Sequence, residues 1–133
     1  NWSDEIKYLN ESNDDLSDDI KNLPNDTGGI YVFYIKGLNL SFIENYILYI
    51  GRCQFTETQH IRKRAREYYK DTRDLIVEMF SRWKEHLYYR YYPDTNNERI
   101  KNNEIQLIRA ILPQYNEVIP DQVDIQDSVP AFE

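Results

Sequence analysis

The sequence has 133 residues but only one cysteine and two histidines. The single Cys53 excludes an intrachain disulfide framework and a zinc site made of several cysteines. His60 and His86 lack metal-binding spacing, so both are interpreted as surface residues. No apolar run approaches the roughly 18 residues of a membrane span, and no N-terminal signal segment is recognisable. We therefore expect one soluble domain, located in the cytoplasm and without membrane contact.

The negative charge is gathered at the two ends of the chain. The net charge is -7, but residues 1–27 contain eight acids and two bases, and residues 111–133 contain five acids and no base. Residues 51–110 contain 13 bases and 9 acids, so the middle of the chain is mildly basic. Because the acid is not spread evenly, the acidic average does not exclude a nucleic-acid partner.

Three runs of β-branched and aromatic residues predict strands. Residues 30–35 and 46–50 would form an antiparallel hairpin around a loop at residues 37–45, and residues 87–92 would form a third strand. Four segments have helical spacing or helix-end signals. They are residues 16–23 before Pro24, a segment containing Ile61, Ala65, Tyr68 and Tyr69, residues 72–84, and residues 97–112 before Pro113.

The resulting order, β-β-α-α-β-α, predicts an α+β fold in which helices flank a small three-stranded antiparallel sheet. Residues 1–22 would form an acidic N-terminal segment with a possible short helix, and its first 15 residues would be mobile or loosely helical. Residues 118–133 would form an acidic C-terminal tail or linker.

Glu104 breaks the pattern of the last predicted helix. At about 100° per residue, Ile100, Leu107, Ile108 and Ile111 all lie within about 60° of it, so Glu104 is in the middle of an apolar stripe. A buried carboxylate costs several kcal/mol unless it is paired or bound to a cation. Two interpretations remain open: Glu104 pairs with an arginine or caps a buried backbone group, or it is a metal ligand or acid/base residue.

Arg64 precedes Tyr68 by four residues, so the two side chains project to the same side of a helix. From spacing alone, the basic run at residues 62–66 is a solvated surface patch, although basic residues interleaved with aromatics also suit a phosphate-binding surface. Tyr31 and Tyr49 are two of 12 tyrosines, and their pattern alone indicates ordinary strand aromatics.

Two short motifs in the predicted hairpin, Gly29-Ile30-Tyr31 and Tyr49-Ile50-Gly51, resemble the signature of the GIY-YIG nuclease family. The helix with Arg64 resembles the basic helix of that family, and the stretches 104–108 and 113–116 resemble its closing E-x-x-L-I and P-x-Y-N motifs. The resemblance covers about residues 23–117, which it implies are the nuclease domain. It is closest in style to the nuclease domain of the bacterial excision-repair incision subunit.

The resemblance implies a divalent-metal-dependent DNA endonuclease with a role for each matching position. Tyr31 would be the general base, Tyr49 would orient the water or Tyr31, and Arg64 would clamp the scissile phosphate. Glu104 would bind one Mg²⁺ or Mn²⁺ ion, and Asn116 would anchor the chain after the last helix. A tyrosine pKa is ordinarily near 10, so nearby positive charge would have to lower that of Tyr31.

Further residues are expected to contact the DNA: Arg52, Arg62, Lys63, Arg66 and Tyr68. Arg52 stands where many family members have a lysine, so a lysine base at this position is not expected. Tyr68 stands where some members have a histidine and others a tyrosine. The stretch between Gly51 and the basic helix is longer than in the excision-repair form, so the choice of Arg64 over Arg62 depends on the alignment across it.

A non-cleaving nucleic-acid-binding module that kept the fold is the main alternative, although the presence of all five motif residues argues against it. An acidic DNA-mimicking inhibitor would need its acid along one face rather than at the two ends. The sequence has no separate DNA-reading motif such as a zinc finger or helix-turn-helix. Target specificity is therefore expected from another domain, from a partner subunit, or from the structure of the DNA.

Overall fold

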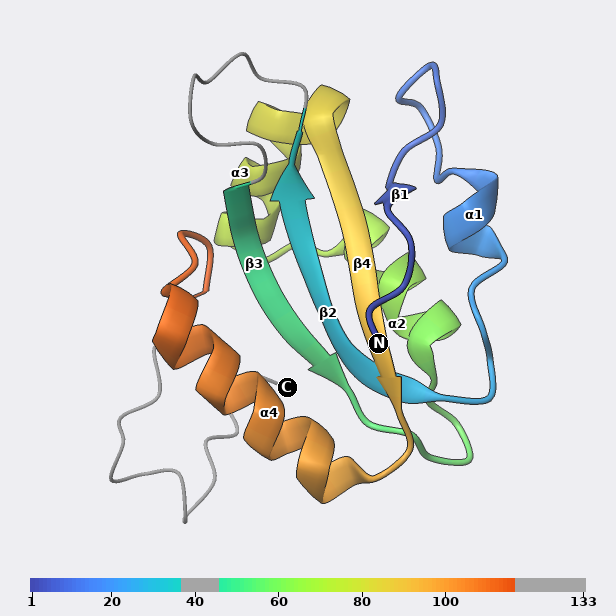
Figure 1. Cartoon of the computed structure of the whole chain (residues 1–133). Coiled ribbons are helices and arrows are strands. Elements are labelled where there is room, and N and C mark those ends of the chain that lie inside the picture. The colour runs from blue at the N-terminus through green and yellow to red at the C-terminus, as the bar shows by residue number, and fades with distance from the viewer. Residues whose placement is uncertain (37–45, 117–133) are drawn as a thin grey trace.

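The sheet is antiparallel and four-stranded, with the strand order β1-β4-β2-β3 (Figure 1). The computed structural model describes residues 1–36 and 46–116. The strands are β1 (Ile6–Lys7), β2 (Gly28–Ile35), β3 (Tyr46–Cys53) and β4 (Leu87–Asp94). The predicted loop at residues 37–45 and the predicted tail at residues 118–133 lie outside the described residues.

Helices cover both faces of this sheet. They are α1 (Asp18–Lys21), α2 (Ile61–Glu67), α3 (Asp74–Trp83) and α4 (Asn97–Ile111), with short 3₁₀ turns at Tyr68–Lys70 and Lys84–His86. Helix α4 crosses one face, and α2 and α3 lie behind the other (Figure 1). None of the helices within the described ranges is long and apolar enough to cross a membrane. The cytoplasmic location stays a prediction.

Strand β2 lies in the middle of the domain, and all eight of its residues are buried. Successive side chains of a strand point to opposite faces, so β2 contributes to two separate apolar clusters. The cluster on the α2 and α3 side contains Tyr31, Phe33 and Ile35, and the cluster under α4 contains Ile30, Val32 and Tyr34. The residues of the first motif therefore divide between the two faces of the sheet.

The α+β class and the antiparallel β2–β3 hairpin are confirmed, but the predicted three strands and their order are corrected. Strand β1 adds a fourth strand along the edge of β4, with Ile6 opposite Tyr89. A two-residue strand is too short to show a period of its own. Its pairing depends on the open edge that β4 presents only after the sheet has formed.

The expectation that the first 15 residues are mobile or loosely helical is wrong. Tyr8 is fully buried, and its hydroxyl donates a hydrogen bond to the carbonyl of Ala65 at 2.6 Å. Leu9 and Leu16 are buried as well and form an isolated β-bridge. The possible short helix is present as α1. The division of the chain at residues 22 and 117 stays a prediction.

Gly51 of β3 makes room for the ring of Tyr31. The two residues are opposite each other in the β2–β3 register. A Cβ atom on residue 51 would lie 2.4 Å from the Tyr31 hydroxyl oxygen and 2.5 Å from Cζ, much closer than van der Waals contact. The glycine of the second motif is therefore required by the tyrosine of the first.

We expect Tyr8→Ala to lower the free energy of unfolding by about 3–5 kcal/mol, because it empties a buried aromatic site and removes a buried hydrogen bond. Urea unfolding measures this change. Tyr46→Ala is the matched control, since Tyr46 is 42% exposed and should change stability by only about 0.5 kcal/mol. Equal unfolding midpoints for the two variants would contradict the placement of residues 1–9 in the core.

Candidate active site

Three tyrosine hydroxyls meet on the α2 side of the sheet. Tyr31 comes from β2, Tyr49 from β3, and Tyr68 from the turn that follows α2. The hydroxyls of Tyr31 and Tyr68 hydrogen-bond to each other, and Tyr68 donates to Tyr49 at 3.3 Å. Tyr31 and Tyr49 reach the same face because Phe33 pairs with Tyr49 in the β2–β3 register, and Tyr31 is two residues from Phe33.

Arg64 binds this tyrosine cluster directly. Its Nε donates to the hydroxyl oxygen of Tyr31 at 3.2 Å, and its guanidinium lies 5.4 Å from the centre of the Tyr68 ring. The second contact follows from the spacing of four residues along the chain. Arg62 instead donates from Nε to the carbonyl of Leu23 at 2.6 Å. Of the two arginines, Arg64 and not Arg62 contacts a motif tyrosine.

The structure does not bring the other basic residues of α2 to the tyrosine cluster. Arg66 donates to the carbonyl of Lys21, the last residue of α1. The Nζ of Lys63 donates to the carbonyl of Thr58 at 3.0 Å, and Lys63 is exposed. Their expected contacts with DNA, like that of Arg62, stay predictions.

Glu104 lies on the opposite face of the sheet, in the buried stripe of α4. Its side chain has no exposed surface, and its Oε1 accepts a hydrogen bond from Nη1 of Arg52, which is itself buried, at 3.4 Å. The ion pair explains how a carboxylate can lie among isoleucines. Glu104 therefore pairs with an arginine, as the first of its two interpretations expects, and its metal binding stays a prediction.

A small cleft of about 140 Å³ connects the two faces at the end of β3. It is lined by Arg52, Cys53, Gln54, Gln59 and Arg64. Because β3 is an edge strand, side chains from both of its faces can border one opening. Burial raises the pKa of the Cys53 thiol to about 12, so this group is neutral and is not a nucleophile. Two arginines therefore line this cleft, and each is already paired with a carboxylate: Arg52 with Glu104 and Arg64 with Glu67, both at 3.4 Å.

Asn116 binds the outer edge of β3. Its Oδ1 accepts a hydrogen bond from the amide of Ile50 at 3.0 Å, and its Nδ2 donates to the carbonyl of Ile50 at 2.8 Å. The amide of Tyr115 donates to the carbonyl of Leu48 at 2.9 Å. These contacts satisfy backbone groups of an edge strand and support the anchoring role expected of Asn116.

Burial raises the pKa of Tyr31 well above its ordinary value, and the charge of Arg64 acts in the opposite direction. Burial also raises the pKa of Tyr68 and of Tyr49. The pKa of Arg64 is raised chiefly by its interaction with Tyr31. Burial outweighs the arginine, so all three phenols are neutral near neutral pH.

Two neighbours of the cluster were not found by sequence reasoning. The ring of Tyr89 from β4 stacks on that of Tyr31, with the centroids 5.7 Å apart. The guanidinium of Arg73 lies 5.7 Å from the centre of the Tyr68 ring. The strand pattern of residues 87–92 could have placed Tyr89 on the inner face, whereas nothing in its local pattern distinguishes Arg73 from the other basic residues.

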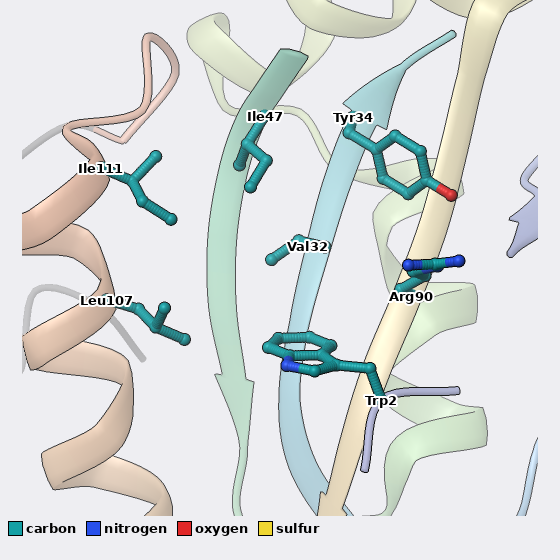
Figure 2. A pocket seen from close by; sticks show the side chains of 7 residues that line it. All are labelled: Trp2, Val32, Tyr34, Ile47, Arg90, Leu107 and Ile111. Carbon is teal, nitrogen blue, oxygen red and sulfur yellow. The ribbon is translucent and has the colours of Figure 1, made fainter. Parts of the chain in front are cut away.

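A larger hollow of about 290 Å³ lies on the α4 face of the sheet (Figure 2). Its lining is mostly apolar and consists of Trp2, Val32, Tyr34, Ile47, Arg90, Leu107 and Ile111. Arg90 is the one charged group of this lining. Without an acid/base group beside a nucleophile or a carboxylate ligand, this hollow is not a candidate site for hydrolysis.

The fold is that of a GIY-YIG nuclease-like domain. The chain is similar to the N-terminal GIY-YIG endonuclease domain of UvrC from Thermotoga maritima in its magnesium-bound form. The TM-score is 0.55 at 20% identity, over 81% of this chain and 99% of that one.

Two point variants of the same Thermotoga maritima domain, each bound to its catalytic divalent cation, are similar as well. A tyrosine-to-phenylalanine variant has a TM-score of 0.55 at 17% identity, over 83% of this chain and 100% of that one. An asparagine-to-alanine variant has a TM-score of 0.53 at 20% identity, over 80% and 97%. No family model and no curated protein matches the sequence. At this identity, the similarity establishes the fold.

The buried phenols should titrate only when the protein unfolds. Burial raises the pKa of Tyr8, Tyr31, Tyr68 and Tyr89. The unfolded chain releases these protons near pH 10 while the folded protein keeps them, so the free energy of unfolding falls as the pH rises above about 10. The part of the tyrosinate absorbance that comes from these buried phenols should rise in one cooperative alkaline step, together with the loss of circular dichroism. Gradual ionisation of all tyrosines in a folded protein would contradict this.

Proposed function

We propose that this chain is a divalent-metal-dependent DNA endonuclease that hydrolyses phosphodiester bonds. The contact between Arg64 and Tyr31, within a GIY-YIG nuclease-like fold, carries the proposal. A phosphate-binding cation and a group that can accept a proton are there 3.2 Å apart. The endonuclease named in the similar structures supports the same reaction class.

Arg64 would hold the scissile phosphate and oppose the negative charge that develops on it. Its guanidinium borders the cleft, and Arg52 lines the same opening from the other face of β3. Both arginines are held by protein groups, Arg64 by Tyr31 and Arg52 by Glu104. Little side-chain entropy is then lost when a phosphate binds.

Tyr31 would accept a proton from the attacking water, and Tyr49 would orient Tyr31 through Tyr68. A neutral phenol is a poor base, and burial keeps Tyr31 neutral. Only the phenolate can accept that proton, so Tyr31 would first release its own proton to solvent. The hydrogen bond from Arg64 favours the phenolate. Asn116 would keep the edge of β3 in place at Ile50, next to Tyr49.

Glu104 is the residue that would hold the metal ion. A carboxylate oxygen is a hard ligand that suits Mg²⁺ or Mn²⁺, and Mg²⁺ commonly takes only one or two carboxylates, with water and phosphate oxygens as its other ligands. No group of three or more His, Cys, Asp or Glu side chains that could hold a metal ion occurs within the described ranges. Water and phosphate oxygens would therefore supply the other ligands, and the buried Arg52–Glu104 pair would have to open to admit the ion. The ion would neutralise charge on the phosphate oxygens.

A supercoiled plasmid should be nicked by the wild type with Mg²⁺ and not in the presence of a chelator. We expect Arg64→Ala to lower the rate about 10²–10³-fold, as for the loss of a group that stabilises transition-state charge. Arg62→Ala is the matched control: it removes the same charge from the same helix, but Arg62 Nε donates to the carbonyl of Leu23 and not to a motif tyrosine. Its expected contact with DNA would affect affinity, so Arg62→Ala should cut at nearly the wild-type rate on saturating DNA.

The same assay tests the alternatives. Retardation of the plasmid without nicking would support a non-cleaving nucleic-acid-binding module, and neither effect would support an acidic DNA mimic. An equal loss of rate in the Arg64 and Arg62 variants would contradict the specific role of Arg64. Fold stability, measured in parallel, separates the loss of a catalytic group from unfolding.

Metal binding by Glu104 can be measured without cleavage. An ion that binds only the folded protein raises its stability, by about 2.7 kcal/mol at 100 times the dissociation constant. We expect Mg²⁺ to raise the melting temperature of the wild type and of Glu98→Gln, a control at an exposed acid of α4. Glu104→Gln should show no such shift relative to its own metal-free value. A normal shift in Glu104→Gln would place the ion elsewhere.

A further inference from the structure

Arg73 is a second arginine at the tyrosine cluster, and neither the family motifs nor the proposed reaction uses it. It directly precedes α3, and its guanidinium lies 5.7 Å from the centre of the Tyr68 ring. The guanidinium of Arg64 lies 5.4 Å from the same centre. Burial raises the pKa of Tyr49, and the nearby charge of Arg73 acts in the opposite direction. Two guanidinium groups from different elements thus approach one ring at the centre of the site.

Asp71 holds Arg73 in a fixed orientation. Nε of Arg73 donates to both carboxylate oxygens at 3.1 Å, and Nη2 donates to Oδ2 at 2.8 Å. The backbone amide of Arg73 also donates to Oδ1 at 2.8 Å. A guanidinium carries five N–H donors, and the contacts with Asp71 use the single N–H of Nε and one N–H of Nη2. The side chain of Arg73 is 36% exposed, so its remaining donors are within reach of a ligand.

We propose that Arg73 is a phosphate-binding position for the DNA strand, and that it takes a phosphate other than the scissile one held by Arg64. The inference rests on the proposed function, because that function places a nucleic-acid strand over the tyrosine cluster. Neighbouring phosphates lie close together along a strand, and the two arginines flank one ring. A pre-oriented guanidinium suits a phosphate because its planar donors match the phosphate oxygens.

Such a contact has a signature that a purely structural arginine lacks. Each neutralised phosphate of duplex DNA contributes about 0.9 to the slope of log affinity against log salt. A contact to a phosphate that does not react binds the ground state and the transition state alike, so its loss raises KM and leaves kcat nearly unchanged. Arg64, at the scissile phosphate, should instead affect kcat.

The experiment measures binding of labelled duplex DNA to Arg73→Gln between about 50 and about 200 mM salt. We expect weaker binding than in the wild type and a slope smaller by about 0.9. Arg73→Lys keeps the charge and should restore the slope. Arg82→Gln is the matched control: Arg82 lies near the other end of α3, is 57% exposed, and also has an acidic partner, Glu78. It should leave the slope unchanged.

An unchanged slope in folded Arg73→Gln, or an equal fall in Arg82→Gln, overturns the proposal. If Arg73→Gln does not fold, Arg73→Met takes its place, and failure of both to fold assigns Arg73 to the fold and overturns the proposal as well. Failure of the Arg73 proposal and failure of the proposed nuclease function can be told apart. A wild type that never cuts, with a reduced slope in Arg73→Gln, refutes the nuclease and keeps the phosphate site. Cleavage by the wild type, with an unchanged slope in Arg73→Gln, supports the nuclease and refutes the phosphate site at Arg73.

Discussion

The pairing of β2 on both edges and its burial on both faces constrain the rest of the domain. β3 and β4 satisfy its backbone groups, and helices cover the side chains on each side (Figure 1). The alternation along β2 sends Tyr31 to the α2 side and Ile30 to the α4 side. Tyr31 then requires a neighbour without a side chain, and Gly51 supplies it. The ring of Tyr31 is fixed by the backbone rather than by a flexible loop, which is the condition for placing its hydroxyl beside Arg64.

The proposed function would require an acidic chain to attract a polyanion. Arg52, Arg64 and Arg73 each contact an acidic side chain or a phenol, and these partners hold them in place before a substrate arrives. An exposed acid more than about 10 Å from these arginines would be largely screened at ordinary salt. Under the proposed function, local charge at the cleft, and not the net charge of -7, would govern the binding of phosphate.

Much of the site could be predicted because its signals are local. The strand pattern of residues 30–35 and 46–50 and the helical spacing from Arg64 to Tyr68 depend on neighbours along the chain. Glu104 was recognisable as a carboxylate in an apolar stripe, and the structure adds its partner, Arg52. Arg73 and the backbone contacts of Arg62 could not be found in this way. Both depend on segments that meet only in the folded domain.

The sequence by itself determined the α+β class, the β2–β3 hairpin and the position of α4, because strand and helix periods are set by local backbone geometry. It also supplied the candidate site residues, whose roles stay predictions. Tertiary structure alone decided the fourth strand, since Ile6–Lys7 forms β1 only against the edge of β4. It likewise decided which of two nearby arginines meets Tyr31. Side chains two residues apart on a helix point to different sides. The packing of α2 against the sheet therefore decides that Arg64, and not Arg62, points to the tyrosines.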